Sequence, residues 1–352
     1  MAGSPKCVPD SPAVAAQRGL TDPRAALAAA VAALAPGTPI AVACSGGADS
    51  AALAVAAAGL RSDVHPVHLF HVHHGLAPQA DQWLARVERL AALLNLPLSL
   101  RYVRVATDLG LGVEGAAREA RYDALREMAA DARISVILLA HHRRDQAETV
   151  LLRLLRGAGV HGMAAMRPDS VRGGLRLLRP WLDVDREQIA KLIDRFAQVT
   201  DWLPVEDASN TDPGYARGAL RSTLAPALRA HWPAWEQTLT RHARQAADVA
   251  GILGEVAAGD LESLDCDPND ASFSLLRWRA LSAPRQALVI RHWLAGQGAR
   301  MPGERRLDDL LRQLRNLHAL GHDRNLVWRH DALEVRCLRG RVVADVPGAA
   351  SS

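Results

Sequence analysis

A short apolar run that ends in a pair of glycines is the feature that most constrains this chain. Residues 40–43 read Ile-Ala-Val-Ala, and Cys44 leads into Ser-Gly-Gly-Ala-Asp-Ser at 45–50. The run is β-prone, Pro39 precedes it and residues 51–58 are almost all helix-forming, so the pattern predicts a buried strand, a tight turn and a helix. Backbone N–H groups and the positive end of the helix dipole would converge at this turn, where a phosphate binds.

The side chains of the turn suit a nucleotide. Gly46 and Gly47 let the backbone approach an anion closely, because they carry no Cβ. Ser45 and Ser50 can donate hydroxyl protons, and Asp49 can hold a Mg²⁺ ion that bridges phosphate oxygens. The spacing differs from the common G-x-x-x-x-G-K-[ST] loop, which indicates another class of nucleotide loop. The alternative is a plain glycine turn capped by serine.

Length and composition set the class of the protein. With 352 residues, the chain is long enough for two domains. No apolar stretch reaches the length of a membrane span and the first residues lack the core of a secretory signal, so we expect no membrane partner. The four cysteines lie far apart without a C-x-x-C pair, which argues against disulfides or a zinc site and favours a reducing cytoplasm.

Strand and helix patterns alternate through the first two-thirds of the chain. Strands are expected at 39–44, 67–72, 98–105, 134–140 and 175–178, and helices at 21–35, 50–59, 81–94, 114–130, 145–156 and 186–196. The alternation predicts an α/β fold with a parallel sheet covered by helices on both faces and ligands at the carboxyl ends of the strands. Beyond residue 215 a smaller, mainly helical domain is expected. Its helices would lie at 221–230, 233–258, 284–296 and 304–317, and its short strands at 325–328, 332–338 and 341–344.

We therefore expect five parts along the chain. They are a flexible tail (1–20), an ATP-binding catalytic domain (21–215), a helical linker (216–240), a substrate-binding domain (241–345) and a second flexible tail (346–352). The charge is uneven, because residues 1–214 hold 23 basic and 23 acidic side chains whereas residues 215–341 hold 19 and 14. The excess could hold a polyanion, although a generic basic surface has the same composition.

Two carboxylates follow the fourth expected strand. Asp145 and Glu148 are three residues apart, so both project from one side of the first helical turn, where they could ligate Mg²⁺ or grip a cationic substrate. Acidic residues also favour helix N-termini for dipole reasons alone. His141 ends the strand and would point into the same cleft, as a candidate proton carrier or phosphate partner. His142 could equally be a packed or solvated side chain.

Histidines and arginines supply two further motifs. The run His71-Val72-His73-His74 ends the second strand, but no Asp, Glu or Cys stands close by, so a loop that shapes a nucleotide pocket is favoured over a metal site. Arg118 and Arg121 lie on one side of a helix, where they could clamp phosphate or stabilise negative charge. Solvated charges with i,i+3 spacing are the alternative.

These motifs together resemble a known family. The Ser-Gly-Gly-x-Asp-Ser loop is typical of the PP-loop ATP pyrophosphatases, and within that superfamily the chain resembles the tRNA(Ile)-lysidine synthetases over about residues 35–340. Two positions depart from the family pattern, since His73 stands where Asn is usual and Gly218 follows Arg217 where Asn is usual. We also expect the chain to lack the last C-terminal domain, or keep only a remnant of it, with which longer members grip the tRNA acceptor arm.

The resemblance implies a ligase that uses ATP. ATP would adenylate the 2-carbonyl oxygen of the wobble cytidine in an isoleucine tRNA with a CAU anticodon, and free L-lysine would then displace AMP to leave lysidine. The loop residues assigned to ATP are Ser45, Gly46, Gly47, Ala48, Asp49 and Ser50, with Mg²⁺ at Asp49. The lysine is assigned to Asp145 and Glu148, and the phosphate or adenylate to Arg118, Arg121 and His141. The C-terminal domain would position the tRNA through its backbone, and a homodimer is one open arrangement.

Two other classes of function stay open. Another PP-loop enzyme, such as a tRNA thiolase or an amide-forming synthetase, would share the loop. However, thiolation usually needs paired cysteines, and Cys44, inside a strand, does not fit the nucleophile of an amidotransferase domain. A non-catalytic nucleotide-sensing or RNA-binding protein is the other class. Turnover of ATP to AMP that depends on both lysine and tRNA would separate these alternatives.

Overall fold

The chain folds into two compact units, the first ending at Ala247 and the second continuing from Asp248. The computed structural model describes residues 22–60, 64–75, 79–104, 112–207, 212–267, 269–317 and 326–345, without the side chains of 112–114. The expected tails at 1–20 and 346–352 lie outside these ranges. The expected domain boundaries at 215 and 240 stay predictions.

A six-stranded sheet forms the centre of the first unit, in the order β3-β2-β1-β4-β6-β5. Its strands are β1 (Ile40–Ala43), β2 (Val67–His73), β3 (Leu98–Tyr102), β4 (Val136–Leu138), β5 (Asp169–Arg172) and β6 (Leu175–Leu178). The five expected strands pair in parallel, as predicted. The sixth strand, β5, was not predicted, and it pairs antiparallel with β6. This strand has no apolar run, and Gly173 and Gly174, both with positive φ, form the hairpin turn that creates it.

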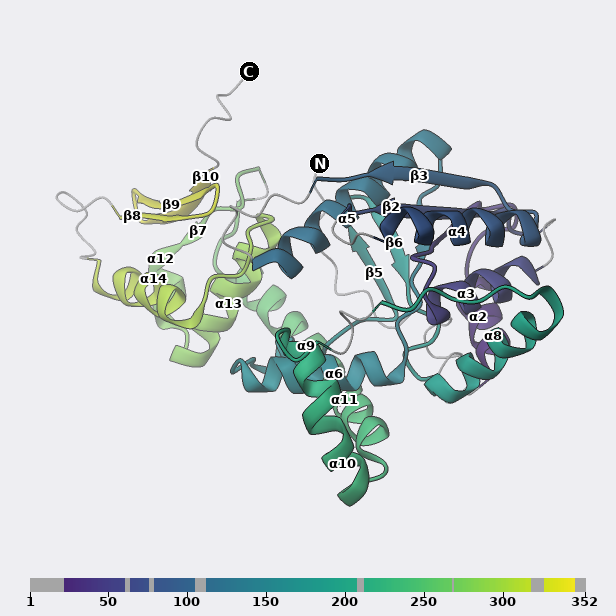
Figure 1. Cartoon of the computed structure of the whole chain (residues 1–352). Coiled ribbons are helices and arrows are strands. Elements are labelled where there is room, and N and C mark those ends of the chain that lie inside the picture. The colour runs from purple at the N-terminus through teal and green to yellow at the C-terminus, as the bar shows by residue number, and fades with distance from the viewer. Residues whose placement is uncertain are drawn as a thin grey trace. The chain divides into compact units, whose positions relative to one another are not determined.

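Helices cover both faces of this sheet (Figure 1). They are α2 (Pro23–Val31), α3 (Ala48–Ala58), α4 (Ala80–Leu94), α5 (Gly112–Ala132) and α8 (Arg186–Thr200). Two further helices, α6 (Arg143–Leu155) and α7 (Val160–Met163), pack instead on elements that follow residue 215. Successive side chains of a strand point to opposite faces, so Ile40 and Val42 pack into a core with α2, α3, α4 and α8, while Ala41 packs into a second core with α5. The predicted α/β architecture is therefore confirmed.

The order of the strands places the functional loops. The chain runs from β1 outward to β2 and β3, and then returns to the other side of β1 with β4. The point where the order reverses lies between β1 and β4, and ligands of open α/β sheets bind in the crevice outside the strand ends at such a point. The loop at 45–50 follows β1 and the N-terminus of α6 follows β4, so both lie at this edge of the sheet.

The segment after residue 215 differs from the single α-helix expected at 221–230. It forms α9 (Ala216–Ala219), the π-helical turn η2 (Leu220–Leu224) and α10 (Ala225–His231), before the long helix α11 (Trp235–Ser263). Pro226 lacks the N–H that a regular helix would direct at the carbonyl of residue 222, which favours a wider turn before it. These elements pack on α6 through Ala147, Leu220 and Trp235.

The second unit combines helices with a small antiparallel sheet in the order β7-β10-β9-β8. Beyond α11 its elements are β7 (Phe273–Ser274), α12 (Leu275–Ala280), α13 (Ala283–Gly296), α14 (Glu304–Asn316), β8 (Val327–His330), β9 (Leu333–Leu338) and β10 (Arg341–Asp345). The short elements β7 and α12 were not predicted, because each is too short to show a hydrophobic period. Phe273, Trp278 and Trp293 fill its core. Among the described residues, no helix is long and apolar enough to cross a membrane.

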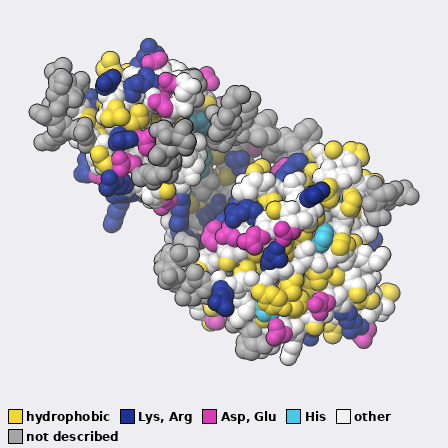
Figure 2. Space-filling model, turned by 90° about the horizontal axis from the view of Figure 1, so that it is seen from above, with side chains coloured by type: hydrophobic (Ala, Val, Ile, Leu, Met, Phe, Trp, Pro, Cys, Tyr) yellow, Lys and Arg dark blue, Asp and Glu magenta, His cyan; other side chains and the backbone are white. Residues whose placement is uncertain are grey.

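The positive charge expected in the C-terminal part lies mainly at its beginning. Residues 215–247 hold five arginines and one acid, Glu236, whereas residues 248–341 hold 14 arginines and 13 acids. On the face shown in Figure 2, basic and acidic side chains lie interspersed rather than gathered by sign. The excess positive charge thus belongs to the segment that packs on α6, within the first unit.

Candidate active site

The loop between β1 and α3 is closed by a contact that only glycine permits. Gly46 has φ +87°, and a Cβ there would lie 3.0 Å from the methyl groups of both Val87 and Val205. The N–H of Val205 donates to the Gly46 carbonyl at 2.9 Å, and Gly47 forms a parallel β-bridge with Val205. Glycine at position 46 therefore stabilises this packing as well as allowing close approach of an anion.

The serine hydroxyls preorganise the same loop. Ser50 Oγ accepts the N–H of Ser45 at 3.1 Å and donates to the Gly47 carbonyl at 3.0 Å. Ser45 Oγ lies 3.1 Å from Ser50 Oγ. Gly47 caps α3 without a side-chain hydrogen bond, so the first N–H groups of the helix remain directed at the loop. This arrangement can bind a phosphate.

His142 connects the loop to the helix that carries the two carboxylates. Its Nε2 lies 3.5 Å from Asp49 Oδ2 and 3.5 Å from Asp145 Oδ2, and its ring is buried. Burial would lower the pKa of His142, but the carboxylates of Asp145 and Asp49 outweigh it and raise that pKa. No role could be predicted for His142. Its two partners, Asp49 of α3 and Asp145 of α6, lie on different helices, and Asp49 is distant from it in the sequence.

The carboxylates of α6 are bound by two arginines that follow residue 215. Arg221 Nε donates to Glu148 Oε1 at 2.8 Å, and its Nη2 donates to Glu148 Oε2 at 2.9 Å and to Asp145 Oδ1 at 3.1 Å. Arg217 Nε lies 3.3 Å from Glu148 Oε2, and Arg217 Nη2 donates to Thr149 Oγ1 at 3.1 Å. Glu148 has 0 % exposure. The predicted pair of carboxylates is thus buried and already neutralised.

The charges around Asp145 decide its protonation. Burial would raise the pKa of Asp145, but His142, His141 and the two arginines outweigh it and lower that pKa to about 2. Asp145 also accepts the N–H of His142 at 3.2 Å, which ties its carboxylate to the first turn of α6. Asp145 is therefore a carboxylate at any physiological pH.

Gly218 permits the fold that presents Arg217. A Cβ at this position would lie 1.9 Å from the carbonyl oxygen of Asp212, a backbone atom that cannot move aside freely. Arg221 lies in the π-turn η2, and such turns are frequent at functional sites. In this chain, the departure from the usual Asn at 218 thus has a structural reason.

His141 lies in a basic environment. Burial, the largest effect, lowers its pKa to about 3. The carboxylate of Asp145 opposes this shift, and the nearby Arg179, Arg118 and Arg217 add to it. Its buried Nδ1 has no hydrogen-bond partner among the described residues. A neutral imidazole suits a hydrogen-bond partner of phosphate better than a proton carrier at neutral pH.

Arg118 and Arg121, expected to act together, have different partners. Arg118 Nη2 donates to Tyr122 Oη at 3.4 Å, and its guanidinium carbon lies 5.3 Å from the centre of the Tyr122 ring. Arg121 Nε donates to His74 Nε2 at 3.4 Å, and burial together with Arg121 lowers the pKa of His74 to about 4. Both arginine side chains are exposed, so a bound anion could still reach them.

The histidines at the end of β2 serve the fold. His71 Nδ1 lies 2.8 Å from the Cys44 carbonyl oxygen, and His73 Nε2 lies 3.1 Å from Asp81 Oδ1. Across the described ranges, no group of three or more metal-ligating side chains forms. Burial raises the pKa of the Cys44 thiol to about 11, so this cysteine is a poor nucleophile.

Comparison with known proteins identifies the family. The model of a PP-loop domain matches residues 23–228, and that of the TilS substrate binding domain matches residues 273–343. A curated tRNA(Ile)-lysidine synthase from Bordetella parapertussis is 56% identical over 323 residues, which cover 92% of this chain and 94% of that protein. The chain belongs to the tRNA(Ile)-lysidine synthase family.

Other relatives agree with this assignment. A tRNA(Ile)-lysidine synthase from Ralstonia nicotianae is 44% identical over 312 residues, which cover 88% of this chain and 65% of that protein. The solved U34-tRNA thiolase NcsA from Methanococcus maripaludis aligns with a TM-score of 0.52 at 10% identity, over 64% of this chain and 78% of that one. At that identity the likeness shows the fold alone. ATP, as a substrate of the PP-loop domain, is part of the family assignment.

The structure brings together most of the residues that the sequence singled out. Asp49, Asp145 and His141 meet at the edge of the sheet, and Glu148 lies one helical turn beyond Asp145. The sequence analysis gave no role to Val205, His142, Arg217 or Arg221. The sequence had drawn attention to Arg217 only through the unusual Gly218 that follows it, and no local pattern pointed to Arg221.

Proposed function

We propose that this chain joins L-lysine to the 2-carbon of the wobble cytidine in an isoleucine tRNA with a CAU anticodon. ATP is converted to AMP and pyrophosphate, and the intermediate is the adenylated tRNA. One observation carries the proposal in addition to family membership. The nucleotide loop and the α6 carboxylates meet through His142, 3.5 Å from Asp49 on one side and from Asp145 on the other.

In the first step, the loop activates the RNA base. The triphosphate lies on the first N–H groups of α3 and the Ser45 hydroxyl, and the cytidine 2-oxygen attacks the α-phosphate as pyrophosphate leaves. A ring carbonyl oxygen is a poor leaving group until it becomes a phosphate ester, which is why ATP is needed. The exposed guanidiniums of Arg118 and Arg121 stabilise the charge that develops on the phosphate oxygens.

The donor set around Asp49 fits a Mg²⁺ ion. Magnesium is usually held by one or two carboxylates together with substrate phosphates. Both oxygens of Asp145 are engaged by Arg221 and His142, whereas the neighbours of Asp49, His142 and Arg186, stay at 3.5 and 3.7 Å. Asp49 is therefore the carboxylate that would hold the ion. When bound, Mg²⁺ neutralises charge on the phosphates and on the departing pyrophosphate.

In the second step, lysine displaces AMP. The carboxylates of Asp145 and Glu148 already bind two guanidiniums, and the same charge and acceptor geometry suit the ammonium of lysine. Because Glu148 is fully buried, lysine reaches it only when Arg217 or Arg221 moves aside. The ε-nitrogen attacks carbon 2 after it has lost a proton, a C–N bond forms, and AMP leaves with the electrons of the C–O bond. Fixing this amine beside the activated carbon supplies the effective concentration for attack.

The test is incorporation of labelled lysine. The protein is incubated with ATP, Mg²⁺, labelled L-lysine and an isoleucine tRNA transcript with the CAU anticodon, and label in the RNA and AMP are both measured. We expect label only when all components are present, and none with a transcript that carries uridine at the wobble position. Absence of label beside an active control enzyme would refute the proposal. A cytoplasmic location and a homodimer stay predictions.

A further inference from the structure

An apolar groove of about 350 Å³ lies beside the α6 carboxylates, between the second half of α6 and the α9–η2 segment. Leu152 and Leu155 of α6 form one wall, with Arg156 just beyond the helix, and Ala219, Leu220 and Leu224 form the other. Leu155 has 73 % of its surface exposed, which is unusual for a leucine in a groove of leucines and alanines. Nothing in the proposed lysine or ATP site uses this groove.

The groove continues the helix face that carries the active site. Glu148, Leu152 and Leu155 have the spacing i, i+4 and i+7, so they form one stripe along α6. At 1.5 Å per residue, Leu152 lies about 6 Å along the helix axis from Glu148. On the opposite wall, Leu220 and Leu224 flank Arg221, the partner of Glu148. A ligand in the groove would thus lie close to the Glu148–Arg221 pair.

One charged side chain lines the groove, and it is basic. Arg156 lies among leucines and alanines from the two walls. Arg217 and Arg221 are paired with α6 carboxylates, but Arg156 at the lip makes no ion pair with a described residue. An apolar floor beside an unneutralised guanidinium matches a nucleobase and its phosphate.

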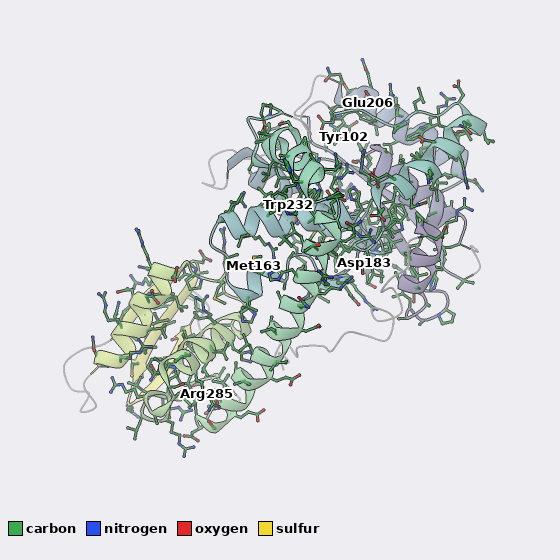
Figure 3. The ribbon with its side chains drawn as sticks, turned by 90° about the horizontal axis from the view of Figure 1, so that it is seen from below. Tyr102, Met163, Asp183, Glu206, Trp232 and Arg285 are labelled. Carbon is green, nitrogen blue, oxygen red and sulfur yellow. The ribbon has the colours of Figure 1, made fainter. Side chains whose placement is uncertain are left out.

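Two exposed aromatic side chains flank the segment that forms this wall, although neither lines the groove. Tyr215 precedes α9, and Trp232, labelled in Figure 3, ends α10 with 63 % of its surface exposed. Bases of single-stranded RNA stack on such rings. Association of two copies through this face would instead oppose arginines to arginines, because a two-fold interface brings the same patch together.

We propose that this groove binds an unpaired nucleotide of the RNA substrate next to the one that is modified. The inference rests on the proposed function, since it assigns the RNA to a specific surface of the same site. Leu155 and its neighbours hold the base by apolar contact, and Arg156 holds the adjoining phosphate. The groove therefore helps to place the wobble cytidine over the nucleotide loop.

The test compares two adjacent leucines. Leu155→Glu places a carboxylate in the groove, whereas Leu154→Glu makes the same change on a side chain that is 54 % exposed and does not line it. We expect Leu155→Glu to weaken binding of the tRNA transcript at least tenfold, with ATP binding unchanged, and Leu154→Glu to bind like the wild type. Arg156→Gln should weaken binding and lower the slope of log affinity against log salt by about one. Circular dichroism checks that all variants are folded.

Other outcomes overturn the inference. Equal tRNA affinity of Leu155→Glu and Leu154→Glu would exclude the groove as an RNA site. A fall in mass from dimer to monomer in Leu155→Glu, measured by light scattering, would assign the groove to a second copy instead. If the wild type binds the tRNA and forms lysidine but the variants match it, only the groove assignment fails. If the wild type neither binds nor modifies the tRNA, the proposed function itself fails.

Discussion

Arg221 binds Glu148 through two parallel hydrogen bonds, from Nε to Oε1 at 2.8 Å and from Nη2 to Oε2 at 2.9 Å. The two residues are 73 positions apart in the sequence, and Glu148 has no exposed surface. The pair therefore holds η2 against α6 and keeps the buried carboxylate neutralised. Its removal should affect stability and catalysis in different ways.

Arg221→Met should destabilise the first unit by about 3–5 kcal/mol, because it leaves a buried carboxylate with only Arg217 beside it. The double variant Glu148→Gln with Arg221→Met removes the charge as well, so we expect most of that loss to be recovered. Neither variant should incorporate lysine. Urea unfolding and the labelled-lysine assay measure the two effects, and a double variant no more stable than the single one would contradict this account.

Asp49→Asn should abolish release of pyrophosphate while changing the free energy of unfolding by less than about 1 kcal/mol, since Asp49 is partly exposed and its ion pairs are long. Asp81→Asn is the matched control. Asp81 also lies in the first turn of a helix and contacts a histidine, but that histidine is His73 of β2 and not a residue that links the nucleotide loop to α6. Full turnover by Asp49→Asn would refute the proposed metal role.

Gly46→Ala should destabilise the protein more than Gly37→Ala. Both glycines have positive φ, +87° and +81°, so both variants carry a similar backbone strain. Only at Gly46 would the new methyl group press on Val87 and Val205, and such overpacking costs a further ~1–3 kcal/mol. Thermal unfolding of the two variants measures the difference, and ATP binding should fall only in Gly46→Ala. Equal melting temperatures would mean that Val87 and Val205 shift to make room for the methyl group without loss of stability.

Gly218→Asn restores the usual family residue, yet it should impair this chain. The new Cβ would displace the Asp212 carbonyl, so we expect Arg217 to lose its position beside Glu148 and the KM for lysine to rise. Gly259→Ala, in helix α11 where a Cβ meets nothing within 4 Å, should be neutral or stabilising by up to about 1 kcal/mol. Unchanged lysine kinetics in Gly218→Asn would show that the 212–218 segment adjusts freely.

Stability should depend on pH through His141. Its folded pKa of about 3 lies below the ordinary 6.5, so the unfolded chain takes up the proton first as the pH falls. The stabilising contribution is thus fully present above pH 6.5 and decreases toward pH 3. Between pH 7 and pH 5 the free energy of unfolding should fall by about 2 kcal/mol less in His141→Asn than in the wild type. Parallel pH profiles for the two proteins would contradict the low folded pKa of His141.

Local patterns predicted the sheet and the nucleotide loop well. The apolar run at 40–43 and the glycines after it are local signals, because each depends only on residues close together in the sequence. The strand β1, the loop and the helix α3 accordingly formed where expected. The pattern did not predict β5 or η2. A four-residue edge strand has too few apolar positions to show alternation, and the π-turn depends on Pro226 and on packing against α6.

The residues of the candidate site also fall into those that a local pattern predicts and those that it does not. Asp145 and Glu148 could be predicted as a pair because their i,i+3 spacing places them on one helix face. Their partners could not be predicted from spacing. Arg221 approaches Glu148 from η2, His142 lies between carboxylates of two helices, and Val205 closes the loop at Gly46.

The sequence by itself determined the α/β class, the phosphate loop and the family, because short-range hydrophobic periods and a local motif carry that information. The tertiary structure alone decided which charges meet. It showed that the carboxylates expected to receive lysine are held by Arg217 and Arg221, and that residues 215–247, which carry most of the excess positive charge in the sequence, belong to the first unit. Ion pairing depends on distances across the fold, and no local pattern in the sequence records those distances.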